Sequence, residues 1–393
     1  MKGLALEGGG AKGAYHIGVV KALYEEGHEF DGFVGTSIGA INAAILAGGD
    51  FDKALEVWGQ ISAEQIFDED EQPILKLIDK KSLTIDSNLL SATRRKALRK
   101  ILENRGINTE RMKAFLLQYF DEEKIRASGK DFGLVTISIS DRKPHELMKE
   151  DIPKGQLFSY IMASAALPVF RKELIDEKAF LDGGFYNNCP YNLLLDKGYD
   201  EVIIIRTNSY GIFRKTDDPR VKVISPRDSL GNSMLFSPES SGAQLKLGYY
   251  DGLRFCRGLL GRRYYVKPGN ETKFIDKLVS LKDNVILNTG NTLRLQPTPA
   301  KRMLFERIIP ILGSYLKLEK NFNYVDFVVA LLEHAAAERA VERFSVYSYE
   351  QLCGLAKETE ICKKEKKTLQ TLSTTYLSPR KEKAIKLLSE QLL

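Results

Sequence analysis

Residues 4–23 have the sequence LALEGGGAKGAYHIGVVKAL. The apolar residues at the start predict a short buried strand, and the second half, from Ala14 on, has the apolar spacing of a helix. A glycine-rich run, 8–13, lies between them. A further apolar segment, 30–34, predicts a second strand. Strand, glycine turn, helix and strand in this order are typical of a βαβ unit, in which the two strands lie parallel in one sheet.

The sequence up to about residue 260 supports the same fold class. A helix is expected over 40–47, and strands over 132–140 and 202–205. Residues 51–128 place apolar side chains at helical spacing instead, which predicts a helical insertion or cap. We therefore expect an α/β fold with helices on both faces of a mainly parallel central sheet.

The chain of 393 residues is too long for one ordinary core, since a domain takes roughly 150 residues. Near residue 260 its character changes, because glycines, prolines and basic residues interrupt it before helical patterns at 301–317 and 322–343. We expect a first domain at 1–260, which contains every motif discussed below, and a mostly helical region at 261–393. The sequence does not indicate the role of this second region.

Composition argues against several classes of protein. Apolar residues make up 43% and charged residues 28% of the chain, as in globular proteins and unlike disordered or collagen-like ones. The four cysteines include no C-x-x-C pair, so neither a zinc ribbon nor a disulfide framework is expected. The apolar run 328–332 is far shorter than the roughly 20 residues of a membrane-spanning helix. No apolar signal segment follows Met1, and we expect a cytoplasmic protein.

The net charge of +6 is modest but unevenly distributed. Residues 363–393 hold eight Lys or Arg against three Glu. This basic segment is either a solvated helix face or a patch for an anionic lipid surface, and the second interpretation predicts peripheral contact with a membrane. Its basic residues are not interleaved with aromatic ones as in RNA-binding segments, so no nucleic-acid partner is expected.

Gly35-Thr36-Ser37-Ile38-Gly39 fits a nucleophile elbow, in which a sharp turn from strand to helix exposes the serine hydroxyl. The flanking glycines, Gly35 and Gly39, relieve crowding at such a turn. An apolar strand before the motif and a helical run after it are the context that the motif requires. The helix N-terminus also favours the negative charge that develops near Ser37 during acyl transfer.

The pattern Gly8-x-Gly10-x-x-Gly13 exposes backbone N–H groups that can bind negative charge. A dinucleotide-binding loop would need an acidic residue at the end of the next strand, whereas Asp31 stands near its start. An oxyanion hole fits better, because the tetrahedral intermediate of acyl transfer needs donors about 3 Å from its oxygen.

A serine nucleophile needs a base. The four histidines are His16, His28, His145 and His334, and only the order Ser37, Asp182, His334 would match an α/β-hydrolase triad. That fold places several strands before its elbow, whereas only two are expected here. The alternative is Asp182-Gly183-Gly184, in which the glycines could project the carboxylate toward a site; the same string is also common as a simple turn. A direct Ser/Asp dyad requires a desolvated carboxylate and a strong oxyanion hole.

Taken together and in this order, the three motifs resemble the patatin-like phospholipase family. Its pattern is G-G-G-x-[KR]-G, then G-x-S-x-G, then D-G-[AG], matched here at 8–13, 35–39 and 182–184. The match continues in the flanking segments 163–170 and 187–190 and covers about residues 1–255. Lys12 stands where most members carry arginine, which keeps the charge but loses the planar fork.

The resemblance implies a three-layer α/β/α fold and a Ser/Asp dyad that needs no metal or other cofactor. Ser37 would be the nucleophile, and Asp182 the base that activates first the serine and then the deacylating water. The oxyanion hole would consist of Gly8, Gly9 and Gly10, assisted by the charge of Lys12. The helical insertion at 51–128 would be a lid or a wall for the acyl chain, or else an ordinary elaborated crossover.

The implied function is hydrolysis of lipid acyl esters, with a phospholipid or lysophospholipid as substrate. Two alternatives use the same residues differently: an acyltransferase or thioesterase with this dyad, and a non-catalytic lipid-binding module. The sequence does not indicate which lipid or acyl position is cleaved, the preferred chain length, an activating ligand or the oligomeric state.

Overall fold

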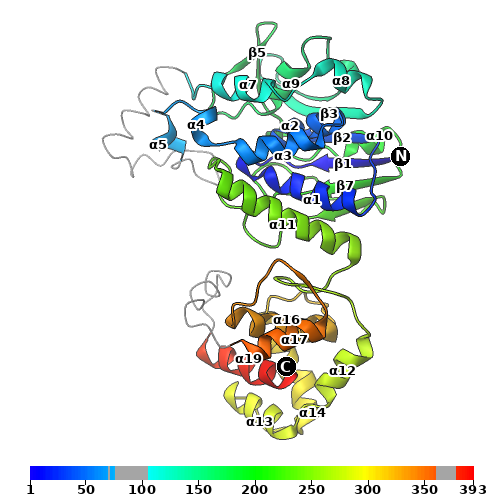
Figure 1. The fold of residues 1–393 in the computed structure, drawn as a ribbon, viewed down its shortest axis with the longest axis vertical. Helices are drawn as coiled ribbons and strands as arrows, with labels where there is room; N and C mark the ends of the chain where they lie inside the picture. The colour runs from blue at the N-terminus through cyan, green and yellow to red at the C-terminus, as the bar shows by residue number, and fades with distance from the viewer. Residues whose placement is uncertain (70, 76–104, 360–377) are drawn as a thin grey trace. The chain divides into compact units, whose positions relative to one another are not determined.

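The computed structural model of the protein describes residues 1–69, 71–75, 105–359 and 378–393 (Figure 1). The chain divides into two compact units, Met1–Leu253 and Arg254–Leu393. The division falls within one long helix, α11 (Pro238–Arg257), a few residues before the boundary near 260 that the sequence indicates. Each unit is described by itself below.

The first unit is built around one eight-stranded sheet in the order β5-β6-β3-β2-β1-β7-β8, with β4 paired to β3. Strands β3, β2, β1, β7 and β8 run parallel, whereas β4, β6 and β5 are antiparallel to their neighbours. The α/β class and the mainly parallel sheet are thus confirmed. The strands are β1 (Lys2–Leu6), β2 (Gly32–Thr36), β3 (Asp131–Ser138), β4 (Lys143–Met148), β5 (Glu173–Ile175), β6 (Lys178–Asp182), β7 (Glu201–Ile205) and β8 (Val221–Ile224).

Helices cover both faces of this sheet. On one face, Ala5, Val34 and Ile204 pack against Leu194 and Tyr199, at and beyond helix α10. On the other face lie α1, the helix of the βαβ unit, and α2, which follows its second strand (Figure 1). The described α-helices of the first compact unit are α1 (Ala14–Glu25), α2 (Ile38–Ala47), α3 (Phe51–Gln60), α4 (Ala63–Ile66), α5 (Gln72–Leu75), α7 (Glu110–Leu117), α8 (Glu122–Ala127), α9 (Leu157–Ser164), α10 (Asn192–Asp196) and α11.

Where the structure describes it, the segment 51–128 contains the helices α3, α4, α5, α7 and α8, joined by turns and loops. Its central part, 76–104, which includes the apolar pattern at Leu77, Ile78, Leu98, Ile101 and Leu102, lies outside the described residues. The prediction of helices there stays a prediction.

The second unit is mostly helical, as the sequence predicts, and its helices enclose a separate apolar core. Helix α19 contributes Ala384, Ile385, Leu388 and Leu392 to that core. The apolar face of this part of the basic segment is therefore buried within the unit, while residues 363–377 lie outside the described ones. The described elements are β9 (Tyr265–Val266), α12 (Glu271–Val279), α13 (Asp283–Thr292), α14 (Ala300–Met303), the π-helix η5 (Leu304–Ile308), α15 (Ile309–Tyr315), α16 (Tyr324–Glu338), β10 (Val346–Tyr347), α17 (Tyr349–Glu358) and α19 (Pro379–Leu392).

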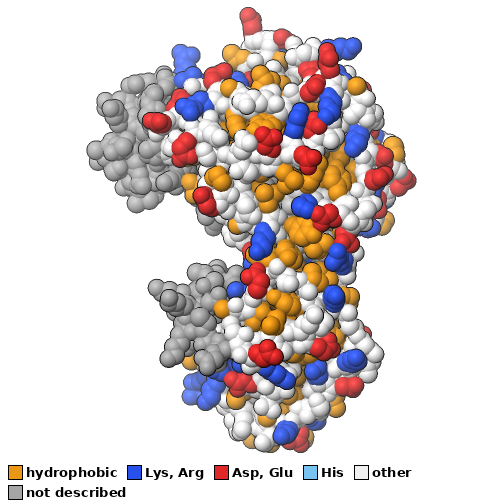
Figure 2. All heavy atoms as spheres, viewed as in Figure 1, with side chains coloured by type: hydrophobic (Ala, Val, Ile, Leu, Met, Phe, Trp, Pro, Cys, Tyr) orange, Lys and Arg blue, Asp and Glu red, His pale blue; other side chains and the backbone are white. Residues whose placement is uncertain are grey.

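Charged side chains of both signs are interspersed over the face drawn in Figure 2. Among the described helices, none combines the length and apolarity needed to cross a bilayer.

Candidate active site

Ser37 occupies the sharp turn between β2 and α2. Its backbone has φ 57° and ψ −128°, a left-handed conformation that is unusual for a residue with a side chain. A Cβ on Gly35 would overlap the backbone of Gly39, and a Cβ on Gly39 would overlap the carbonyl of Leu6. The two glycines of the motif are therefore required by close backbone approach, and the turn has the geometry of a nucleophile elbow.

The register of the sheet brings Asp182 to the same edge as Ser37. Thr36, which precedes the serine, pairs with Val135 on β3, and the next residue of β3, Thr136, pairs with Asp182 at the end of β6. Strand β3 continues beyond this level to Ser138, and β6 runs back along it and ends at Asp182, next to the level at which β2 ends. The side chains of Ser37 and Asp182 line one pocket, although they are far apart in the sequence.

Asp182 is buried, with 3% of its surface exposed. Its Oδ1 accepts a hydrogen bond from the N–H of Gly184 at 2.7 Å, while Oδ2 is buried without a partner of good hydrogen-bond geometry. Burial raises the pKa of Asp182 to about 6, and the nearby Ser37 hydroxyl and the Gly184 N–H oppose this rise. The carboxylate is thus a stronger base than an exposed aspartate, yet it is mostly ionised at neutral pH.

The glycine-rich loop offers two N–H groups to this pocket. The N–H of Gly8 donates to the carbonyl of Asn188 at 3.0 Å, so it is engaged within the fold. Those of Gly9 and Gly10 have no acceptor among the described residues, and both residues line the pocket with Ser37 and Asp182. Of the three glycines expected to form an oxyanion hole, the geometry therefore favours Gly9 and Gly10.

The remaining glycines of the motifs allow close packing around the site. A Cβ on Gly13 would overlap the ring of Trp58, and a Cβ on Gly183 would overlap the carbonyl of Val135. Gly184 brings its N–H to Asp182 and leaves no room for a side chain beside Asn188. These positions shape the site without providing reacting groups.

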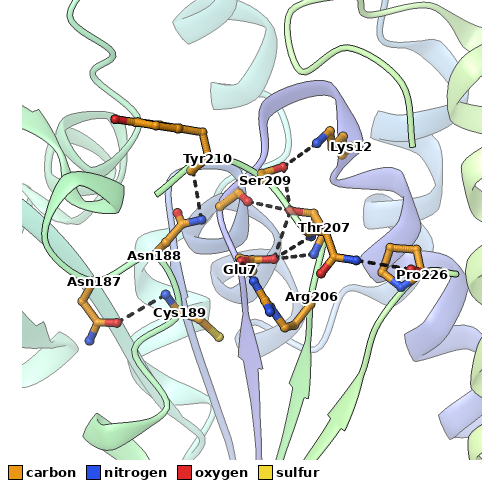
Figure 3. A network of polar contacts seen from close by, with 12 residues as sticks. Glu7, Lys12, Asn187, Asn188, Cys189, Arg206, Thr207, Ser209, Tyr210 and Pro226 are labelled. Atoms are coloured by element: carbon orange, nitrogen blue, oxygen red, sulfur yellow. Dashed lines mark hydrogen bonds and ion pairs between the residues drawn. The ribbon is translucent and has the colours of Figure 1, made fainter. Parts of the chain in front are cut away.

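Lys12 does not line the pocket. Its ammonium group donates to Ser209 Oγ at 2.8 Å, and Ser209 in turn contacts Thr207 (Figure 3). Lys12 therefore belongs to a polar network that lies behind the glycine-rich loop. Figure 3 shows how this network continues to Glu7 and Arg206 at the ends of β1 and β7.

A second, apolar pocket adjoins the first and shares Ser37 and Gly10 with it. It is lined by side chains from α2, from the 51–128 insertion and from the segment that precedes α11. Phe67 and Met112 come from the insertion, which places that segment at the wall of this pocket. The other apolar side chains that line it are Ile38, Ile41, Ala165, Leu167, Phe170, Met234 and Phe236.

No histidine lines either pocket around Ser37 in the described part of the chain. His334 is therefore not among the residues that line the pockets of Ser37, and these pockets lend no support to the α/β-hydrolase triad. His16 is fully buried in α1, where desolvation lowers its pKa to about 3. Among the described residues there is also no cluster of His, Cys, Asp or Glu that could hold a metal ion.

Several residues of the site were not found from the sequence. Thr207 and Ser209 follow β7, and Met234 and Phe236 lie in a loop without regular structure. One signal could have identified the first pair: carboxyl ends of parallel strands meet at one edge of a sheet, and β7 was predicted as a strand. The loop residues carry no comparable pattern.

Comparison with known proteins bears on this arrangement. The sequence profile of the patatin-like phospholipase family matches residues 4–195. Those residues contain the glycine-rich loop, the elbow and Asp182. The chain carries a patatin-like phospholipase domain.

Two curated relatives illustrate the similarity. A mouse protein named patatin-like phospholipase domain-containing protein 6 is 26% identical over 213 residues, which is 52% of this chain and 13% of that protein. The lysophospholipase nte1 of Aspergillus terreus is 27% identical over 213 residues, 53% of this chain and 12% of that protein. The chain thus spans about an eighth of the length of the relatives that it matches.

Among solved structures, VipD from Legionella pneumophila matches with a TM-score of 0.41 and 15% identity, covering 100% of this chain and 84% of that one. The type III effector protein ExoU matches with a TM-score of 0.27 and 15% identity, covering 98% of this chain and 78% of that one.

Proposed function

We propose that the protein is a serine acyl hydrolase that cleaves lipid acyl esters, with Ser37 as nucleophile and Asp182 as base. The observation that carries the proposal is the position of Ser37 where two pockets meet. One pocket holds the buried carboxylate and two N–H groups that have no acceptor in the part of the chain that the structure describes. The other pocket is lined mostly by apolar side chains. Acyl transfer from a lipid needs the base and the oxyanion donors on one side of the nucleophile and an apolar site for the acyl chain on the other.

In the first half of the reaction, Ser37 Oγ attacks the acyl carbonyl carbon and gives its proton to the Asp182 carboxylate. The carbonyl oxygen becomes an oxyanion, which accepts hydrogen bonds from Gly9 and Gly10 and lies near the N-terminus of α2. The intermediate then expels the alcohol, which takes the proton from Asp182. An acyl group is left on Ser37.

In the second half, Asp182 takes a proton from a water molecule that attacks the acyl-enzyme. The second oxyanion accepts hydrogen bonds from the same two N–H groups. Its collapse breaks the bond to Ser37 Oγ and releases the fatty acid, while Oγ takes the proton back from Asp182. The pKa of about 6 suits Asp182 for both halves, because the carboxylate is mostly ionised at pH 7 but more basic than an exposed one.

The apolar pocket supports a lipid acyl chain as the group transferred. Burial of apolar surface contributes roughly 25 cal/mol per Å², so a chain laid against Phe67, Phe170 and Phe236 would be bound mainly by the hydrophobic effect. The insertion would then act as a wall of the acyl site through Phe67 and Met112. A phospholipid or lysophospholipid fits this description.

The test is hydrolysis of phospholipid vesicles and of lysophospholipid micelles by the wild type, Ser37→Ala and Asp182→Ala. We expect free fatty acid from the wild type alone, with no loss of rate in EDTA. Fatty acid production by Ser37→Ala, or transfer of the acyl group to an added alcohol without hydrolysis, would contradict the proposal. The second result would favour the acyltransferase alternative.

Peripheral membrane contact through the basic segment 363–393 stays a prediction. Replacement of Lys363, Lys364, Lys366 and Lys367 by glutamine should weaken flotation with anionic liposomes and reduce its dependence on salt. Unchanged flotation would exclude these lysines as the membrane contact.

A further inference from the structure

Thr207 lies directly behind the glycine-rich loop, two residues after the end of β7. It is buried, with 1% of its surface exposed, and its hydroxyl donates a hydrogen bond to the carbonyl oxygen of Gly8 at 2.7 Å. A Cβ on Gly9 would crowd this hydroxyl, so the loop and Thr207 are in close contact. Neither the sequence motifs nor the proposed reaction uses Thr207.

The geometry of a peptide bond links this contact to the reaction. The Gly8 carbonyl and the Gly9 N–H belong to one planar trans peptide, in which the C=O and N–H bonds point in opposite directions. A hydrogen bond that holds the carbonyl toward Thr207 therefore holds the Gly9 N–H away from it. Gly9 lines the pocket that contains Ser37 and Asp182, and its N–H has no acceptor among the described residues.

A chain of donors determines which way the Thr207 hydroxyl points. Thr207 has one hydroxyl proton and two neighbours that only accept, the Gly8 carbonyl at 2.7 Å and Glu7 Oε2 at 3.4 Å, and the shorter contact assigns the proton to Gly8. The contact of 2.9 Å with Ser209 Oγ is then donated by Ser209. Ser209 in turn accepts from the ammonium of Lys12 at 2.8 Å. Lys12, Ser209 and Thr207 thus form a chain of hydrogen bonds that ends at the Gly8 carbonyl (Figure 3). The hydrogen bonds of such a chain polarise and strengthen one another.

The backbone of Thr207 is anchored independently of its hydroxyl. Its N–H donates to Glu7 Oε2 at 2.6 Å, and the N–H of Asn208 donates to the same oxygen at 2.9 Å. Arg206 Nη2 binds the other oxygen of Glu7 at 2.7 Å. Removal of the hydroxyl alone should therefore leave the segment in place and free only the Gly8–Gly9 peptide.

We propose that Thr207 is a positioning residue for the oxyanion hole: its hydroxyl, oriented by Lys12 through Ser209, aims the Gly9 N–H at the pocket of Ser37. This inference rests on the proposed acyl-hydrolase function. The orientation of Gly10 does not depend on Thr207, because the carbonyl in its peptide plane, that of Gly9, accepts from the N–H of Lys12 within the loop. Thr207 should therefore influence one of the two donors.

The test compares Thr207→Val, which keeps the shape and loses the hydroxyl, with Thr207→Ser, which keeps the hydroxyl. Loss of one oxyanion donor lowers kcat by about a hundred- to a thousandfold, and we expect Thr207→Val to lower it by at least tenfold with KM changed less than twofold. Thr207→Ser should stay within threefold of the wild type. Thr289→Val, which removes another buried threonine hydroxyl in the second unit, is the matched control and should leave kcat unchanged.

A second readout separates positioning from a general loss of structure. A trifluoromethyl ketone with an acyl chain forms a tetrahedral adduct with the serine, and its inhibition constant should rise in Thr207→Val by the same factor as kcat/KM falls. An unchanged kcat and inhibition constant would overturn the inference, as would an equal loss in Thr207→Ser or a loss confined to KM. A wild type without Ser37-dependent activity would instead overturn the proposed function itself, and this inference with it.

Discussion

Replacement of Asp182 by asparagine should abolish hydrolysis and at the same time stabilise the first unit at neutral pH. Asparagine keeps an oxygen that can accept from the Gly184 N–H, and its amide group can donate to Ser37 Oγ. What it removes is the buried charge. Because catalysis requires this charge and folding does not, activity and stability should change in opposite directions.

The size of the gain follows from the pKa of Asp182, which the fold raises from 3.8 to about 6. One pKa unit corresponds to about 1.4 kcal/mol, so ionisation of Asp182 costs the folded state on the order of 3 kcal/mol. The unfolded chain ionises first as the pH rises. Wild-type stability should therefore fall between about pH 4 and pH 6, and the advantage of Asp182→Asn should grow over the same range, vanish below it and stay constant above it.

Trp58 provides a selective assay, because it is the one tryptophan of the chain and is fully buried in α3 of the first unit. Urea unfolding followed by its fluorescence, from pH 4 to pH 8, gives the free energy of unfolding of both proteins. Asp141→Asn is the matched control: Lys178 and Ser138 lower the pKa of this exposed carboxyl, so its replacement should bring no gain at pH 7.5. If Asp182→Asn is no more stable than the wild type at pH 7.5, the inference that the Asp182 carboxylate is desolvated at a cost to folding is refuted.

Three further predictions address catalysis, the elbow and the acyl site. The kcat/KM for a soluble nitrophenyl ester should rise tenfold per pH unit up to about pH 6 and level off above pH 7; a rise that continues to pH 8 would indicate a different base. Gly39→Ala should destabilise the first unit by roughly 1–3 kcal/mol, since its Cβ overlaps the Leu6 carbonyl. Gly59→Ala, in open space on α3, should instead stabilise it by about 0.5–1 kcal/mol. Equal urea midpoints of the two variants, measured by circular dichroism, would contradict this. Met112→Trp should lower the kcat/KM ratio of long-chain over short-chain esters at least threefold, and Phe236→Ala should raise it; a common factor for all chain lengths would place the acyl chain elsewhere.

The parts of the site that were predictable from the sequence depend on local signals. The strand, glycine loop, helix and elbow lie within the first 50 residues, and each is marked by apolar periodicity or by glycines that the backbone requires. Asp182 was singled out by its two glycines and by the family resemblance. The register that brings it to Ser37 could not be read in this way, because it depends on the pairing of β2, β3 and β6 across the sheet.

The parts that were missed depend on contacts between distant segments. Gly8 was expected to contribute to the oxyanion hole, but its N–H donates to the carbonyl of Asn188. No local sequence pattern places Asn188 beside Gly8. The contact through which Lys12 could assist by its charge, the hydrogen bond from its ammonium group to Ser209, was likewise not predictable, because the two residues are far apart in the sequence. Met234 and Phe236 reach the apolar pocket from an irregular loop, and such a loop has no periodicity from which its buried side chains could be predicted.

The central claim is that Ser37 is a nucleophile activated by Asp182. It is tested most directly by reaction with a fluorophosphonate, followed by mass spectrometry of the labelled peptide and measurement of the labelling rate. The account predicts one label, on Ser37, no label on Ser37→Ala, and labelling of Asp182→Asn at least tenfold slower than that of the wild type at pH 7.5. A label on another residue, or equal rates for the wild type and Asp182→Asn, would contradict it.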